Sequence, residues 1–134
     1  MQHMDLDSKY PGVADLRRRA QMRMQKFVWE FLDSGTGLEA TKARNRAALD
    51  QIGFMPSVLH GEQAVDLSTQ FLGHTYPVPF GMAPIGMSGL MWPDAEGHLA
   101  RAAARAGVPY TLSNVAAQSP EDVAPHLGDQ AWFQ

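Results

Sequence analysis

The chain has 134 residues with a formal charge of −3 and no cysteine. Its length suits one domain with a core of its own, and 45% hydrophobic with 19% charged residues is the balance of a folded globular protein. The charge provides no basic field for nucleic acid, and no run of about 18 apolar residues could span a membrane. The lack of cysteine excludes disulfide and thiolate chemistry and favours a cytoplasmic protein.

Residues 10–56 are predicted to form an N-terminal helical segment. Over 11–32, apolar side chains recur at helical spacing with arginines between them, which indicates one long amphipathic helix. The run Ser34-Gly35-Thr36-Gly37 ends it, because glycine supplies the positive φ that a helix C-terminus favours. A second, shorter helix is predicted over 39–51.

Residues 65–78 are predicted to form a β-hairpin. Two alternating arms, 65–72 and 75–78, flank the pair Gly73-His74, and a two-residue turn with glycine between such arms is typical of a hairpin. Two prolines keep the second arm at a sheet edge, Pro77 and Pro79.

Residues 79–134 are predicted to form a strand–helix–strand–helix–strand unit, which is α/β. Proline and aspartate start the first helix and Gly107 ends it, while Ser119-Pro120-Glu121-Asp122 starts the second with an N-cap serine and a proline at the first helical position. Strands joined in this way run parallel. The expected strands are 80–84, 108–113 and 131–134, and the expected helices run from 93 to 105 and from 119 to near 128.

Three such strands cannot close a barrel, which needs about eight. The third expected strand is only begun when the sequence stops. We therefore expect residues 1–134 to be a single partial domain at the front of a longer protein. As an independent chain it would have an open sheet with an unpaired edge, a surface for a partner.

The stretch Pro84-Ile85-Gly86-Met87-Ser88-Gly89 follows the first expected strand directly. Proline, glycine and serine at this position have two interpretations. Either the chain bends here, or a flat group lies against the backbone. Taken singly, Gly86 is a turn glycine, Ser113 a helix or turn cap, and Gln134 a terminal residue. The five histidines show no metal-ligand spacing, so no metal site is expected.

Four segments in a fixed order carry a resemblance to a known family. They are "FVWEFLDSGTGLEATKARNRAALDQIGFMPSVL", "VDLSTQFLG", "PFGMAPIGMSGLMWPDAEGHLARAAARAGVPYTLSN" and "SPEDVAPHLGDQAWFQ". Together they resemble the N-terminal third of the FMN-dependent α-hydroxy-acid dehydrogenases and oxidases, the group of L-lactate dehydrogenase, glycolate oxidase and mandelate dehydrogenase. The resemblance covers residues 10 to 134.

The resemblance implies a TIM (β/α)8 barrel with FMN at the C-terminal ends of its strands. This chain would supply the N-terminal helices, the hairpin and the first three parallel strands. The implied activity of the parent protein is oxidation of an L-lactate-like 2-hydroxy acid to the 2-oxo acid, with FMN as hydride acceptor. Whether it is a dehydrogenase or an oxidase is left open, although the stretch Leu90-Met91-Trp92-Pro93 weakly favours the lactate and mandelate dehydrogenases.

The resemblance also assigns flavin contacts. Pro84, Ile85 and Gly86 match the segment whose backbone lies against the flavin ring near its reactive N5 edge, where a bulky side chain would push the ring away. Ser113 matches a residue that contacts the flavin. Gln134 matches a glutamine whose amide reaches the pyrimidine side of the ring, where it can both donate and accept.

Two departures from the family qualify this expectation. Phe31 stands where members commonly carry a tyrosine that binds the substrate carboxylate, so it keeps the shape of a substrate-binding residue without the donor. The family's catalytic residues lie later in the barrel, so none is expected in this chain, which alone should be inactive.

The alternatives are a relative with a different substrate and a truncated fragment that serves as an interaction module. The expected partners are a small 2-hydroxy acid and the remainder of the barrel, with no nucleic acid and no transmembrane segment. A homo-oligomer is left open.

Overall fold

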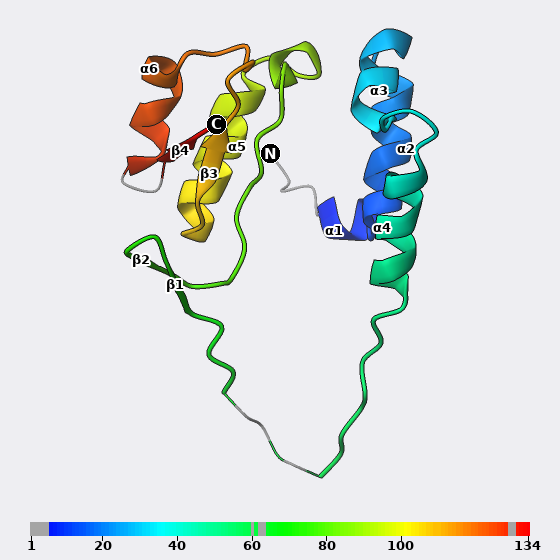
Figure 1. Ribbon diagram of the computed structural model, residues 1–134, viewed down its shortest axis with the longest axis vertical. Helices are drawn as coiled ribbons and strands as arrows, with labels where there is room; N and C mark the ends of the chain where they lie inside the picture. The colour runs from blue at the N-terminus through cyan, green and yellow to red at the C-terminus, as the bar shows by residue number, and fades with distance from the viewer. Residues whose placement is uncertain (1–5, 60, 62–63, 129–130) are drawn as a thin grey trace. The chain divides into compact units, whose positions relative to one another are not determined.

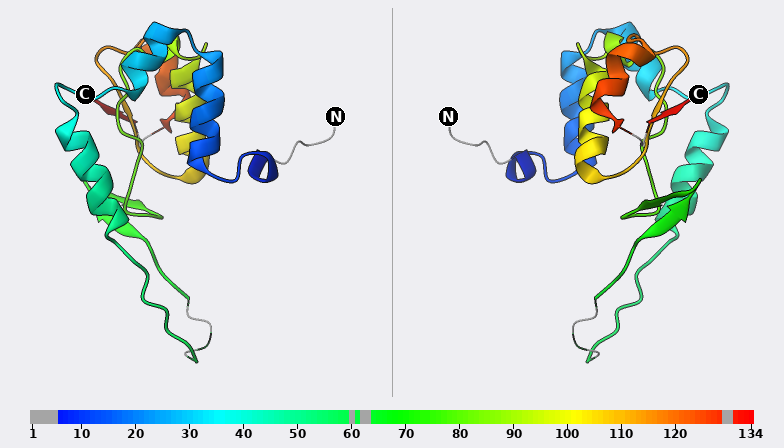
Figure 2. Two further views of the ribbon diagram at one scale, coloured as in Figure 1. Left: turned by 90° about the vertical axis from the view of Figure 1, so that its right-hand side faces the viewer. Right: turned by 90° about the vertical axis from the view of Figure 1, so that its left-hand side faces the viewer.

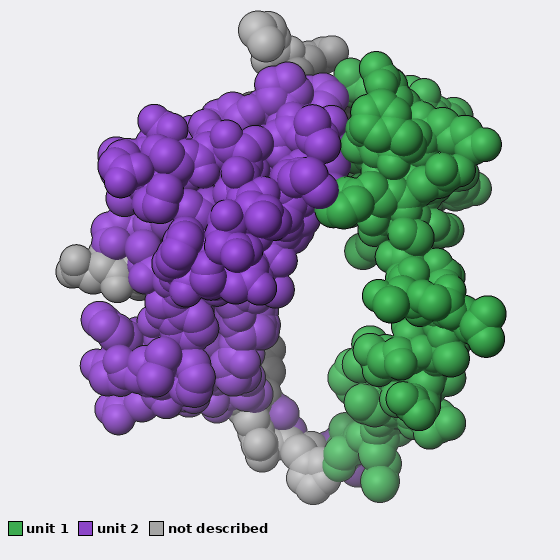
Figure 3. Space-filling view, turned by 45° about the horizontal axis from the view of Figure 1, so that its top comes forward, with its two compact units in different colours: residues 1–58 green, residues 59–134 purple. Residues whose placement is uncertain are grey.

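The computed structural model describes residues 6–59, 61, 64–128 and 131–134, and its chain divides into two compact units. The first unit is Met1–Val58 and the second is Leu59–Gln134 (Figure 3). The helices and strands of both units are labelled in Figure 1.

The first unit consists of helices. They are α1 (Leu6–Lys9), α2 (Val13–Arg23), α3 (Lys26–Asp33) and α4 (Ala40–Asp50). The single helix predicted over 11–32 is therefore wrong, because Met24 and Gln25 have extended backbone with ψ of 149° and 148° and separate α2 from α3. The helix predicted over 39–51 is confirmed as α4.

Polar contacts hold α2, α3 and α4 in place. The Arg17 guanidinium donates two hydrogen bonds, of 2.9 and 2.7 Å, to the Asp33 carboxylate, and these bonds hold the pKa of that carboxyl below its usual value. Lys42 donates to the Asp33 backbone carbonyl. Most apolar side chains of α2 and α3 are exposed, and Val28 is their one buried residue, so this unit contains little core of its own.

The second unit begins with a short antiparallel hairpin, β1 (Thr69–Phe71) and β2 (His74–Tyr76). The predicted hairpin is confirmed, but its turn lies one residue earlier, at Leu72 and Gly73, which have φ of 50° and 82°. Two positive φ values in a two-residue loop match the twist of the flanking strands. His74 therefore pairs with Phe71 instead of lying in the turn.

A segment with parallel strand pairing follows the hairpin, whose two strands are drawn in green in Figure 2. Its elements are η1 (Ser88–Leu90), α5 (Ala95–Ala106), β3 (Tyr110–Leu112), α6 (Pro120–Val123), η2 (Ala124–His126) and β4 (Ala131–Phe133). Strands β3 and β4 pair in parallel, as predicted.

The strand predicted over 80–84 is only a parallel bridge between Met82 and Tyr110. The Met82 N–H donates to the Pro109 carbonyl, and the Met82 carbonyl accepts from Thr111. Phe80, expected in a buried strand, is 68% exposed. Prolines at both ends of this short segment remove backbone donors, which limits its pairing.

The core of the second unit lies between α5, β3 and the α6–η2 segment. It consists of Ala100, Ala103, Val108, Tyr110, Leu112, Val123 and Leu127. Alanines on α5 allow the helix to approach the strand closely. Two of the predicted caps are confirmed: Gly107 has φ of 68° at the end of α5, and Ser119 forms a capping box with Asp122 at the start of α6. The glycine cap with positive φ predicted after the first helix is wrong, because α3 ends at Ser34 in extended backbone, with φ of −80° and ψ of 155°, and Gly35 has no positive φ.

Replacing Tyr110 with phenylalanine is expected to stabilise the protein by about 1 kcal/mol, because the Tyr110 hydroxyl is buried and makes no hydrogen bond within the described residues. Burial, and then the nearby Glu96 charge, raise the pKa of this hydroxyl. Urea unfolding of both proteins measures the difference. A loss of stability would mean that the hydroxyl has a partner in the native protein.

Candidate functional site

The residues predicted to contact a flavin come together at one edge of the parallel arrangement. Pro84, Ile85 and Gly86 follow the Met82 bridge, Ser113 follows β3, and Gln134 follows β4. Because the carboxyl ends of parallel strands meet at one edge, these positions become neighbours.

The contacts among these residues are direct. The buried Ser113 hydroxyl donates to the Gln134 side-chain carbonyl over 3.3 Å, and the Gln134 backbone N–H donates to the Leu112 carbonyl over 3.0 Å. A Cβ placed on Gly86 would lie 3.8 Å from the Ser113 hydroxyl oxygen. The segment after the Met82 bridge and the ends of β3 and β4 thus bring a glycine, a hydroxyl and an amide together.

Two loops carry these residues, and they touch. We call residues 83–92 the Gly86 loop and residues 113–118 the Ser113 loop. The Met87 N–H donates to the Val115 carbonyl over 2.9 Å, and a Cβ on Gly86 would lie 2.8 Å from a Val115 methyl. The Ser113 hydroxyl also accepts from the Val115 N–H, so Ser113 is a turn cap as well as a site candidate.

Glu96 is a buried carboxylate beneath both loops, in the first turn of α5. Burial raises the pKa of its carboxyl, but hydrogen bonds from backbone amides and the nearby Ser88 hydroxyl outweigh burial, so the pKa lies below its usual value. Sequence reasoning missed this residue, since an acid in the first turn of a helix is usually a solvated complement to the helix dipole.

A second polar cluster surrounds the start of α5. Asp94 accepts hydrogen bonds from Arg101 and Gln118, and the bond from Arg101 is the main reason that the pKa of the Asp94 carboxyl lies below its usual value. Arg101 also contacts His98 and His126. Because its acid is already paired with a guanidinium and an amide, this cluster is structural.

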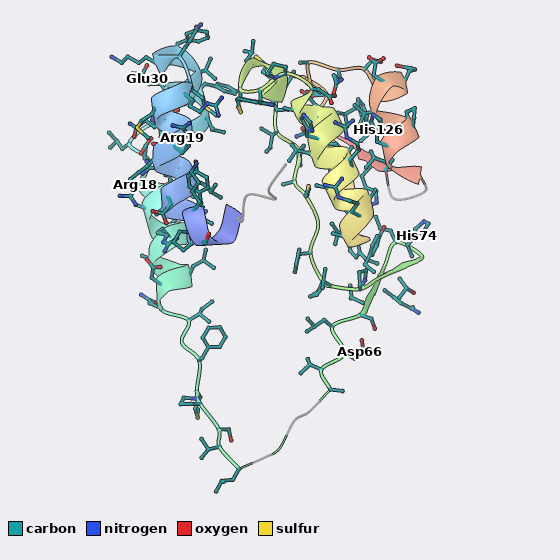
Figure 4. The ribbon with its side chains drawn as sticks, turned by 180° about the vertical axis from the view of Figure 1, so that it is seen from behind. Arg18, Arg19, Glu30, Asp66, His74 and His126 are labelled. Atoms are coloured by element: carbon teal, nitrogen blue, oxygen red, sulfur yellow. The ribbon has the colours of Figure 1, made fainter. Side chains whose placement is uncertain are left out.

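The histidines do not assemble into a metal centre in the part of the chain that the structure describes. Figure 4 shows His74 on the hairpin and His126 at the end of η2, in separate places. His3 and His60 lie outside the described residues.

An apolar hollow of about 340 Å³ lies elsewhere in the second unit, between the hairpin and the parallel strands. Phe71, Tyr76, Met82, Thr111 and Trp132 are among its lining residues, whereas Gly86, Ser113 and Gln134 are not. We therefore place the candidate site at the strand ends, where polar groups and backbone converge, and not in this hollow.

The family model for FMN-dependent dehydrogenases matches residues 20–134. The chain belongs to that family. The resemblance stated from the sequence is thus confirmed, and FMN is the cofactor in the family's description.

Relatives of this chain include two bacterial proteins called L-lactate dehydrogenase. The one from Xanthomonas campestris pv. campestris (strain B100) is 36% identical over 123 residues, which are 92% of this chain and 32% of that protein. The one from Ectopseudomonas mendocina (strain ymp) is 37% identical over 120 residues, or 90% and 32%. The chain spans about a third of the length of these relatives.

Solved structures of similar chains are a mandelate oxidase and a mutant of an active chimera of (S)-mandelate dehydrogenase. The first has a TM-score of 0.83 and 34% identity, and covers 93% of this chain and 36% of that one. The second has a TM-score of 0.81 and 34% identity, covering 91% and 35%. The chain shares their fold over this stretch, while its described strands do not close a barrel.

Phe31, the predicted substrate-side residue, lies in α3 of the first unit and is 49% exposed. It is therefore not a core residue of its own helix unit. No helix among the described residues is both long and apolar enough to pass through a bilayer.

Proposed function

We propose that the protein containing this chain is an FMN-dependent dehydrogenase or oxidase of small L-lactate-like 2-hydroxy acids, and that this chain forms the ring side of its flavin site. The observation that carries the proposal is the meeting of Gly86, after the Met82 bridge, with Ser113 and Gln134, at the ends of β3 and β4. The names of the relatives, L-lactate dehydrogenase and mandelate oxidase, support the substrate class.

The residues at this edge of the parallel strands suit the flavin ring of FMN. The Gln134 side chain is exposed and carries both a carbonyl and an NH₂, and Ser113 holds that carbonyl, which leaves the NH₂ for a flavin carbonyl. Gly86 has no side chain to keep a flat ring from the backbone, and Pro84 and Ile85 flank it with apolar surface. These residues bind and orient, and we assign no proton-accepting base to this chain.

Bound FMN supplies the hydride acceptor: the substrate loses hydride from Cα and the hydroxyl proton, and becomes the 2-oxo acid. Ser113 and Gln134 orient the ring from its pyrimidine side. We further propose that the full protein forms a (β/α)8 barrel, is cytoplasmic, and needs the remainder of the barrel for FMN binding and activity.

The proposal is tested on the full-length protein. It should purify with FMN, and L-lactate or mandelate should bleach the visible flavin absorption without oxygen, with one 2-oxo acid formed per flavin reduced. Rapid reoxidation in air would favour the oxidase. A protein that takes up no FMN, or whose flavin no 2-hydroxy acid reduces, would overturn the proposal.

Phe31→Tyr is expected to lower the KM for L-lactate about tenfold if Phe31 faces the substrate carboxylate, because a hydrogen bond to a charged group contributes about 1.5 kcal/mol or more. The visible flavin spectrum should not change. Steady-state kinetics of the full-length enzyme measures KM, and Phe27→Tyr, at another exposed phenylalanine one turn earlier on α3, is the matched control. An unchanged KM would remove Phe31 from the substrate site.

A further inference from the structure

A single carboxylate oxygen joins the two loops of the candidate site. Oε1 of Glu96 accepts a hydrogen bond of 3.3 Å from the Gly89 N–H in the Gly86 loop and one of 2.9 Å from the Ala117 N–H in the Ser113 loop. Glu96 is fully buried and belongs to α5, whose alanines pack in the core. The helix thus holds both loops through one atom.

The Gly86 loop and the Ser113 loop are packed closely where Glu96 joins them. A Cβ on Gly89 would lie 2.5 Å from the Ala117 Cβ, well inside the distance that real Cβ atoms keep. The Met87 N–H also donates to the Val115 carbonyl, a second bond between the two loops. A displacement of Glu96 would therefore shift both loops, and with them Gly86 and Ser113.

Burial of the charged Glu96 carboxylate beneath the two loops costs free energy. Glu96 makes no ion pair among the described residues, and its Oε2 makes no hydrogen bond of ordinary geometry, although the buried Ser88 hydroxyl lies near the carboxylate. An apolar side chain would avoid the cost of burying a charge. The carboxylate fixes the positions of the two loop amides, since charge-assisted hydrogen bonds are short and directional.

We propose that Glu96 is a positioning residue for the flavin site, whose carboxylate fixes the Gly86 loop relative to the Ser113 loop through the amides of Gly89 and Ala117. The Glu96 carboxylate is buried and bonds to loop amides, so we assign it no direct contact with flavin or substrate. It acts through the loops that it joins. The proposal rests on the proposed function, because the loops matter for catalysis only if FMN lies against them.

The test uses the full-length holoenzyme with Glu96→Gln, which keeps the size of the side chain and removes its charge. We expect FMN to bind about tenfold more weakly, as the difference between a charged and a neutral hydrogen bond implies, and the visible circular dichroism of bound flavin to change. Glu121→Gln makes the same substitution at an exposed position on α6 and should change neither measurement.

A second variant approaches the same junction without altering the charge. Gly89→Ala presses against Ala117 and should separate the loops, so its visible circular dichroism should change in the same direction, even if Glu96→Gln fails to fold. A merely structural role predicts lower melting temperatures with unchanged FMN affinity and flavin spectrum in both variants, and that result would overturn the inference. If the wild-type protein binds no FMN, the proposed function itself fails, and the inference fails with it.

Discussion

Gly81→Ala is expected to destabilise the protein by about 3 kcal/mol, the upper end of the usual cost of overpacking. A Cβ at this position would lie 2.6 Å from Cγ of Pro109 and 2.8 Å from its backbone carbonyl oxygen. That oxygen accepts the Met82 N–H, so it cannot move without loss of the bridge between Met82 and Tyr110. Urea unfolding of the full-length protein measures the effect.

Gly53→Ala is the matched control for this substitution. A Cβ on Gly53 meets nothing within 4 Å, and its φ is not in the left-handed region. Alanine there restricts the unfolded chain and should change stability by less than about 1 kcal/mol. Equal effects at Gly81 and Gly53 would show that the contact with Pro109 does not limit the side chain at 81.

Gly86→Val is expected to weaken FMN binding about 100-fold, or about 2.7 kcal/mol. The nearest obstacle to a new Cβ is a methyl of Val115, which is 55% exposed and can turn away, so the fold should tolerate the change. The added methyl groups would then occupy the surface on which we place the flavin ring. Loss of FMN with a nearly unchanged melting temperature of the apoprotein is the expected pattern, measured by flavin fluorescence titration and calorimetry.

Gly53→Val carries the same added groups at an open position in the first unit and should leave FMN binding unchanged. Wild-type affinity in Gly86→Val would exclude Gly86 from the flavin site. Family membership would be untouched by that result, because it rests on the match over residues 20–134.

Sequence patterns within a few residues predicted the helix caps of the second unit well. They did not predict the features that depend on long-range packing. Ser119 and Gly107 were predictable as caps because the chemistry of a cap lies within a few residues. The break at Met24 and Gln25 was not, because neither residue is a helix breaker and apolar spacing continues across it. The hairpin turn lies one residue earlier than predicted because Leu72 adopts a positive φ, which leucine rarely does.

For the candidate site, strand order explains what could be predicted. Placing Ser113 and Gln134 after successive parallel strands required only topology, and the structure brings their side chains together. Their role towards FMN stays a prediction. Glu96 was missed because its burial depends on two loops that lie 7 and 21 residues away along the chain. No spacing in the sequence distinguishes it from a solvated acid.

The order of parallel pairing has a consequence for how the protein is made. Met82 pairs with Tyr110, and Tyr110 in turn pairs with Ala131, so each strand finds its partner in the segment synthesised just before it. These contacts close loops of roughly twenty to thirty residues, for which the entropic cost is modest. The second unit can therefore be assembled strand by strand as the chain leaves the ribosome. Early folding would shelter its apolar segments from association with other nascent chains.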